Sequence, residues 1–218
     1  MKDRLKNILQ GFYKQDKLFV RLPIMLFSVI MMGFCLSWLI LVNWGTDPCS
    51  AMNLAISARL GISFGTWQAS LNIALFIIVI LCGGNDIGYG TFANMFLVGY
   101  SSDFFSWVWS KVLPAGFLDP MGIKIAVFVV AIIVFVFVAA IYMDSGLGMA
   151  PYDAIPFIIK DKVLKKVPFK VIRTALDFTA ILISVVLGRK VGIATICMAL
   201  LLGTVIEFVG HKMKKILG

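Results

Sequence analysis

Two short stretches, WGTDPCSA (Trp44–Ala51) and LGMAPYDA (Leu147–Ala154), interrupt a strongly apolar chain with the same Gly-x-x-Pro spacing, 103 positions apart. Proline lacks a backbone N–H and clashes with a preceding helical turn, and glycine permits backbone angles that other residues avoid. Each stretch therefore predicts a break after a hydrophobic span, with the proline in the first turn of a new helix. The N–H groups at such a helix start carry partial positive charge and can hold an anion.

The composition predicts an all-α, polytopic helical membrane protein. Hydrophobic residues make up 61% of the 218 residues and charged residues 14%, whereas soluble domains have about 45–50% and about 25%. Apolar runs such as Leu18–Trp44 and Ile125–Met143 are long enough to cross about 30 Å of hydrocarbon as helices. The first run is too long for the apolar region of a cleaved signal peptide, so we expect it to be retained as a membrane helix.

The charged and reactive residues exclude several function classes. The formal charge of +9 fits Lys and Arg that flank membrane helices on the cytoplasmic side, so no nucleic-acid partner is expected. The four cysteines form no CxxC or Cys/His spacing, and the single histidine, His211, lies in a basic tail. We therefore expect no metal site and no cofactor. The absence of HExxH and GxSxG motifs from the sequence indicates that the protein is not an enzyme.

The chain overlays itself when it is shifted by 103 or 104 positions, which predicts two tandem repeats. Each repeat contains a long first span, at about 18–44 and 123–143, and then a broken or short helix, at about 48–60 and 151–160. Two further pieces follow in each repeat, at about 66–82 and 88–109 in the first and about 170–187 and 191–210 in the second. The expected organisation is a basic cytoplasmic segment 1–17, repeat 1 at 18–110, a linker at 111–122, repeat 2 at 123–211 and a basic cytoplasmic tail at 212–218. The matched pairs include Gly45–Gly148, Pro48–Pro151, Gly88–Gly192, Thr91–Thr195, Gly99–Gly203 and Asp103–Glu207.

Two orientations of the repeats are compatible with this pattern. If the short segments dip into the membrane and return, six spans remain and the repeats are inverted, as in many secondary transporters. If the short segments continue across, the repeats are parallel. The basic residues favour parallel repeats, because Arg21 pairs with Lys124 and Arg59 with Lys162 at equivalent positions.

The two breaks supply the first candidate site residues. Asp47 is placed to cap the helix that begins at Pro48. In the second copy Ala150 replaces this acid, and Asp153 lies two residues after Pro151 instead. The two half-sites therefore differ in charge. The alternative is that both breaks are interfacial loops with capped helices.

Further candidates lie in the later helices of each repeat. Gly88, Thr91, Gly99 and Asp103 form a stripe of small residues that ends in an acid, and close helix packing is favoured over a ligand path. Asp177 is the most deeply placed acid; Arg173 lies one helical turn before it, and both an ion pair and a cation or proton site are compatible. The candidate ligand-binding residues are Gly45, Asp47, Pro48, Asn72, Thr91, Asp103, Gly148, Pro151, Asp153, Asp177, Thr195 and Glu207.

With these features the chain resembles the YczE/YyaS/YitT family of bacterial integral membrane proteins. The resemblance is carried by GTDPCSAMNLAISARLGISFG and GGNDIGYGTFANMFLVGYSSDF in the first copy, and by GLGMAPYDAIPFII and LGRKVGIATICMALLLGTVIEF in the second. Pro151-Tyr152-Asp153 fits the family pattern, whereas Pro48-Cys49-Ser50 departs from it. The resemblance implies a location in the bacterial cytoplasmic membrane.

Interrupted helices at matching positions indicate a transport site. We therefore expect a small-molecule transporter or permease-like protein whose polar site lies between the repeats, with membrane lipids around it and both termini in the cytoplasm. The alternative is a non-transporting scaffold or regulator that binds a protein or lipid partner through its helix stripes and basic tails. The sequence leaves the oligomeric state open.

Overall fold

The computed structural model describes residues 17–82 and 87–200. Regular structure in this part is helical throughout, which confirms the all-α prediction. Glu207 and most of the two predicted basic terminal segments lie outside the described residues. The helices are α2 (Leu18–Val42), α3 (Pro48–Leu60), α4 (Phe64–Leu81), α5 (Tyr89–Ala93), the π-helical turn η1 (Asn94–Val98), α6 (Gly99–Val112), α7 (Met121–Asp144), α8 (Pro151–Lys162) and α9 (Phe169–Val186), followed by helical residues 193–200.

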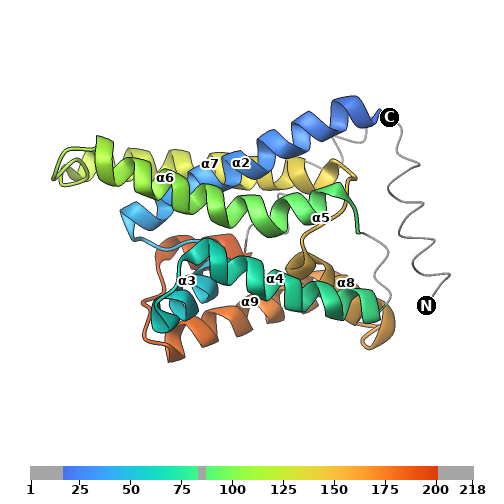
Figure 1. Ribbon diagram of the computed structural model, residues 1–218. Helices are drawn as coiled ribbons and strands as arrows, with labels where there is room; N and C mark the ends of the chain where they lie inside the picture. Colours follow the sequence, from blue (N-terminus) through green and yellow to red (C-terminus); the bar gives the residue numbers. More distant parts are fainter. Residues whose placement is uncertain (1–16, 83–86, 201–218) are drawn as a thin grey trace.

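The helices form two layers (Figure 1). One layer contains α2, α6 and α7, and the other contains α3, α4, α8 and α9. Helices α2 and α7 pack along each other, and buried residues of both, including Leu36, Leu39, Phe135 and Ala139, belong to the main apolar core. This pairing forms one wall of the interior into which the two breaks project.

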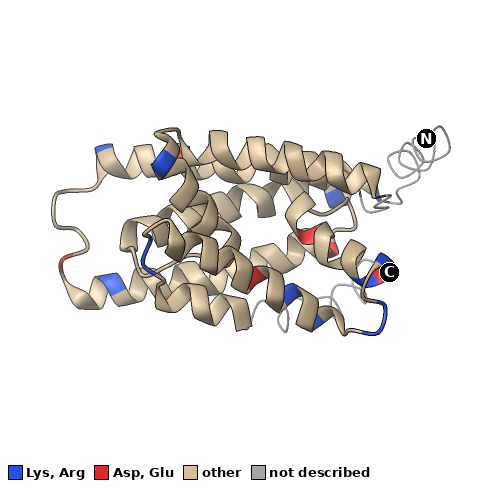
Figure 2. Cartoon of the chain, turned by 90° about the horizontal axis from the view of Figure 1, so that it is seen from below, with Lys and Arg blue, Asp and Glu red and all other residues tan. Residues whose placement is uncertain are grey.

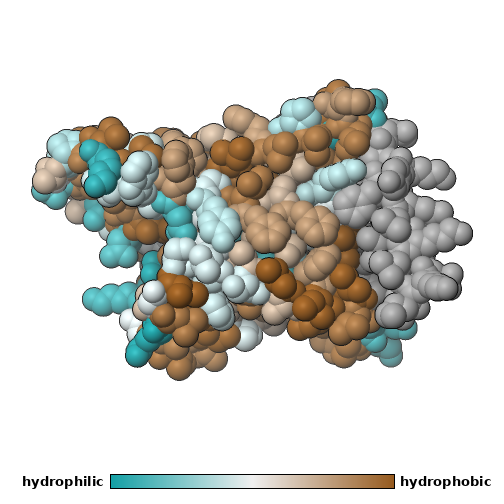
Figure 3. All heavy atoms as spheres, in the orientation of Figure 1, coloured by the Kyte–Doolittle hydropathy of each residue, from teal (hydrophilic) through white to brown (hydrophobic). Residues whose placement is uncertain are grey.

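The outer surface is suited to lipid. Among the described residues, α2, α4 and α7 are long and apolar enough to cross a membrane. Large apolar side chains such as Ile77, Phe104 and Trp107 are exposed, and hydrophobic colour covers much of the face shown in Figure 3. Most of the helical surface carries no charge (Figure 2). Burying so much exposed apolar area in hydrocarbon is what stabilises such a surface.

Helices α2 and α7 run in opposite directions, so the expectation of parallel repeats is wrong. The guanidinium of Arg21, near the start of α2, donates a hydrogen bond to the carbonyl oxygen of Ser145, just after the end of α7, at 3.4 Å. At the other end, Lys124 Nζ lies 5.3 Å from the centroid of the Trp44 ring. Helix α3 begins in the interior and runs back toward the end of the molecule at which α2 ends. Helix α8 likewise begins in the interior and runs back toward the end at which α7 ends (Figure 1).

The basic residues that favoured the parallel arrangement have local packing partners instead. Arg59 Nε, near the end of α3, donates to the carbonyl oxygen of Leu187 at the end of α9, at 3.3 Å. Lys162 Nζ, at the end of α8, donates to the carbonyl oxygen of Cys82 at the end of α4. A cation at a helix C-terminus is favourable because it meets the unsatisfied carbonyl groups there. These helix ends therefore favour a basic residue at both ends of the molecule, independently of which end faces the cytoplasm.

Candidate functional site

The two breaks fit against the opposite half of the chain. Gly45 and Gly148 have φ angles of +104° and +98°, which side chains with a Cβ rarely adopt. A Cβ on Gly45 would lie 2.7 Å from Thr195 Oγ1, and a Cβ on Gly148 would lie 2.7 Å from Thr91 Oγ1. Glycine is therefore required at both positions by the backbone angle and by the approach of a threonine.

Matched backbone hydrogen bonds fix these contacts. Gly90 N donates to the carbonyl oxygen of Leu147 at 2.7 Å, and Ala194 N donates to the carbonyl oxygen of Trp44 at 3.2 Å. Thr195 Oγ1 also accepts from Thr46 N at 3.3 Å. The two contacts are equivalent in the repeat pattern, because Trp44 and Leu147 lie 103 positions apart and Gly90 and Ala194 lie 104 positions apart. Thr91 and Thr195 therefore position the breaks.

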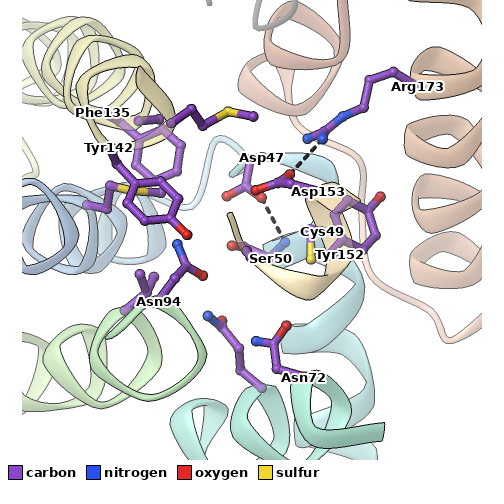
Figure 4. Close-up of a pocket in the computed structure, with 16 residues that line it drawn as sticks. Asp47, Cys49, Ser50, Asn72, Asn94, Phe135, Tyr142, Tyr152, Asp153 and Arg173 are labelled. Atoms are coloured by element: carbon purple, nitrogen blue, oxygen red, sulfur yellow. Dashed lines mark hydrogen bonds and ion pairs between the residues drawn. The ribbon is translucent and has the colours of Figure 1, made fainter. Parts of the chain in front are cut away.

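The starts of α3 and α8 line one cavity of about 70 Å³ (Figure 4). Asp47 caps α3, because its Oδ2 accepts from Ser50 N at 3.0 Å, as the sequence predicted. Ala150, at the same place before α8, has a side chain that cannot cap. Asp153, in the first turn of α8, lines the same cavity. The two half-sites thus differ in charge, also as predicted.

The side of the cavity formed by α8 and α9 is ionic. Arg173 Nη1 lies 2.6 Å from Asp153 Oδ1, and Arg173 Nε lies 3.3 Å from Asp177 Oδ2. Tyr152 OH donates to Asp177 Oδ1 at 3.1 Å, and the Arg173 guanidinium lies 5.5 Å from the centroid of the Tyr152 ring. The predicted Arg173–Asp177 pair is confirmed and extends to Asp153. Asp177 supports this group from behind the cavity lining.

The side formed by α4 is neutral. Gln68 and Asn72 lie four and eight residues after Phe64, the first residue of α4, and both line the cavity. Arg173 and Asp177 lie four and eight residues after Phe169, the first residue of α9. Two uncharged amides therefore occupy on α4 the helical positions that an ion pair occupies on α9.

The remaining wall combines an amide with aromatic and apolar groups. Asn94 and Val98 come from η1, and Met32, Phe135 and Tyr142 come from α2 and α7. A π-helical turn inside a longer helix often marks a functional site, and here it holds the buried Asn94 at the cavity. Tyr142 OH donates to the carbonyl oxygen of Gly90 at 3.2 Å, which ties this wall to the contact at Gly148.

Asp103 lies away from the cavity and serves a helix start. Its Oδ2 accepts from Gly65 N, in the first turn of α4, at 2.8 Å. Gly99, one turn earlier on α6, packs against the backbone of Gly65, where a Cβ would lie 2.7 Å from Gly65 Cα. The stripe of small residues thus brings α4 and α6 close together, which is the use that the sequence favoured.

The structure brings only some of the predicted site residues to the cavity. Asp47, Asn72 and Asp153 line it, while Pro48 and Pro151 begin the two short helices behind these acids. Thirteen further lining residues, on or next to seven helices, were absent from the predicted set of ligand-binding residues. They are Met32, Cys49, Ser50, Gln68, Asn94, Val98, Phe135, Ala139, Tyr142, Met143, Ala150, Tyr152 and Arg173. For Gln68 the available signal was a polar amide within an otherwise apolar span.

Comparison with known proteins gives relatives along most of the chain. The model of a family described as "Family of unknown function (DUF6198)" matches residues 19–211. The uncharacterized membrane protein YczE of Bacillus subtilis is 25% identical over 164 residues, which cover 75% of this chain and 73% of YczE. The uncharacterized protein YyaS of the same organism is 22% identical over 170 residues, 78% of this chain and 82% of YyaS.

A third relative, an uncharacterized protein of Haemophilus influenzae, is 23% identical over 189 residues, covering 86% of this chain and 82% of the relative. No solved structure matches the chain. The family matches confirm the resemblance to YczE and YyaS, and together with the apolar helices they identify a membrane protein.

Proposed function

Because the chain belongs to the family of unknown function DUF6198, we propose a function from its own geometry: a small-molecule transporter of the permease type. Its substrate site is the cavity between the two halves, residues 18–110 and 123–200. One observation carries the proposal. Two short helices, one from each half, begin at glycine–proline breaks and present their first turns to a single buried polar cavity.

The arrangement is that of transporters in which two half-units lie in opposite orientation about a central site. In such proteins interrupted helices aim their N-termini at the substrate, and one unit rocks against the other. The opposite directions of α2 and α7 support this interpretation. So do the paired contacts of Gly45 with Thr195 and Gly148 with Thr91, which are what two copies of one unit would make.

We place the protein in the bacterial cytoplasmic membrane with both termini in the cytoplasm. Basic residues crowd the N-terminal stretch Met1–Arg21 and the segment Lys160–Lys170. Arg21 lies beside the end of α7, from which the chain continues into α8, so Arg21 and the segment Lys160–Lys170 lie toward the same end (Figure 1). Positive residues of short loops favour the cytoplasmic face.

Cys49 provides the test, because it lines the cavity and is a native thiol. Cys35, Cys82 and Cys197 are replaced by alanine, the protein is reconstituted in one orientation, and a charged, membrane-impermeant thiol reagent is added to either face. A transporter exposes its site alternately, so we expect Cys49 to react from both faces. A matched variant that keeps only Cys35, buried in the core beside α7, should not react.

The scaffold alternative predicts a different result. Reaction of Cys49 from one face alone, or from neither, would contradict transport. A protein partner that co-purifies in equal amount with such an unreactive protein would favour the scaffold.

A further inference from the structure

Two buried oxygen atoms at the cavity have no hydrogen-bond donor among the described residues. Asp47 Oδ1 and Gln68 Oε1 are each buried and unpartnered, and both side chains line the cavity. Their residues are only 9% and 6% exposed. A buried acceptor without a donor costs roughly 1–3 kcal/mol, and more when it is charged. Both atoms are acceptors, so they call for a ligand that is positively charged or donates hydrogen bonds.

The charge around the cavity points in the same direction. Three carboxylates, those of Asp47, Asp153 and Asp177, lie at or next to the cavity, and one guanidinium, that of Arg173, pairs with the last two. The starts of α3 and α8 each add about half a positive charge. About one negative charge therefore remains uncompensated, which one monovalent cation would balance.

The two unpartnered oxygens come from different sides of the cavity: Gln68 belongs to the neutral side formed by α4, and Figure 4 shows Asp47 beside Asp153. On the ionic side, Arg173 holds Asp153 and Asp177, and Tyr152 holds the second oxygen of Asp177. Gln68 stands at the helical position of Arg173, so α4 offers an amide where α9 offers a cation, and the ion pairs of Arg173 go to Asp153 and Asp177 while Asp47 Oδ1 stays without a hydrogen bond. A bound cation would take the place that a second arginine would fill.

We propose that the cavity binds a small monovalent cation through Asp47 Oδ1 and Gln68 Oε1, either an alkali ion or a protonated amine of similar size. The cation's role as a transport substrate or coupling ion rests on the proposed function, whereas cation binding itself does not. The cavity of about 70 Å³ has room for such an ion together with water, because a cavity of about 10–15 Å³ already holds one water molecule.

Thermal unfolding of the purified full chain in detergent tests the proposal without requiring transport. Choline chloride is replaced stepwise, at constant ionic strength, by the chloride of sodium, potassium, ammonium or methylammonium. Choline is the reference because it has no N–H donor and is larger. A ligand that binds the folded state raises the unfolding temperature, so we expect a saturable rise with at least one of the four. Rises with sodium or potassium alone assign an alkali ion, and rises with the ammonium ions alone assign an amine.

Two variants and a control locate the effect. Asp47→Asn keeps an oxygen for the Ser50 cap but removes the carboxylate charge that attracts the cation, and should weaken the cation response about tenfold or more. Gln68→Arg supplies a tethered cation and should abolish the response while the protein unfolds at a higher temperature. Asp103→Asn, at a half-buried helix cap away from the cavity, should respond like the wild type.

Three outcomes would overturn the proposal. They are an unfolding temperature that none of the four cations changes, an equal response of Asp47→Asn and the wild type, and a response confined to divalent ions. If cation binding fails while Cys49 still reacts from both faces, the transporter survives and only the cation assignment is lost. If cations bind but Cys49 reacts from one face, the transporter is lost and the site remains.

Discussion

At the scale of single residues, the glycines of the two breaks are the least replaceable positions. Gly148 combines a φ of +98° with the approach of Gly88 and Thr91. We expect Gly148→Ala to lower the free energy of unfolding by about 1–3 kcal/mol, from backbone strain. Gly122→Ala is the matched control, because nothing lies within 4 Å of a Cβ there. Equal thermal unfolding of the two variants would contradict the interlocked breaks.

The ionic group around Arg173 allows a prediction about compensation. Arg173→Gln leaves Asp153 and Asp177 without their cation, and breaking a buried pair costs about 3–5 kcal/mol. Adding Asp177→Asn reproduces the Gln68–Asn72 pair of α4, so the double variant should recover part of this loss. Thermal unfolding of the wild type, both single variants and the double variant gives the coupling energy. A coupling energy near zero would show that the pair contributes nothing.

Some residues of the site could be predicted from the sequence and others could not. Asp47 stands directly before a proline that begins a helix, so its capping role followed from local chemistry. Asn72 was a candidate because it lies 105 positions before Asp177, one residue out of register with the repeat. Gln68 and Asn94 were missed, because a neutral amide in an apolar helix gives little sign of which face it occupies. Their places depend on helix rotation and on the π-helical turn.

At the scale of elements, the short helices agree closely with the sequence pattern. The segment expected at 48–60 is α3 (Pro48–Leu60), and the segment expected at 151–160 is α8 (Pro151–Lys162). The piece expected at 88–109 is divided into α5, η1 and α6. This division could not be predicted, because π-helical geometry arises from packing and has no distinct residue pattern.

The start of α4 depends on an acid from another helix. Asp103 of α6 accepts from Gly65 N, so it acts as a helix cap supplied from outside the helix. We expect Asp103→Ala to lower the free energy of unfolding by about 0.5–2 kcal/mol, the usual loss for a cap. Chemical denaturation in detergent measures it. The cation response should be unchanged, and a variant that loses this response would place Asp103 in the site.

At the scale of the whole molecule, the orientation of the halves was the feature that the sequence misjudged. Same-sign residues at equivalent positions, such as Arg59 and Lys162, were interpreted as topology signals. In the structure each donates a hydrogen bond to a carbonyl oxygen at the end of a helix from the other half. That contact favours a basic residue whichever side of the membrane it lies on. Charge counting cannot separate these causes when the basic residues are few.

The antiparallel arrangement predicts where two loops lie. The loop before α7 and the loop after α8 lie toward opposite ends of the molecule (Figure 1), and each carries an exposed residue, Ala115 in the first and Lys165 in the second. In a background without native cysteines, Ala115→Cys and Lys165→Cys should react with an impermeant reagent from opposite faces of the membrane. Reaction of both from the same face would restore the parallel model.

The central claim is that the two helix starts meet at one cavity, and cross-linking tests it most directly. Cys49 is paired with Asp153→Cys in a chain that lacks the other cysteines, and a protease site is introduced into the loop at 114–119. Both positions line the cavity, so a short bifunctional thiol reagent should keep the two halves joined after cleavage. Lys165→Cys, exposed beyond α8, is the control that should not cross-link with Cys49. Separation of the halves in the Cys49/Asp153→Cys variant would contradict the account.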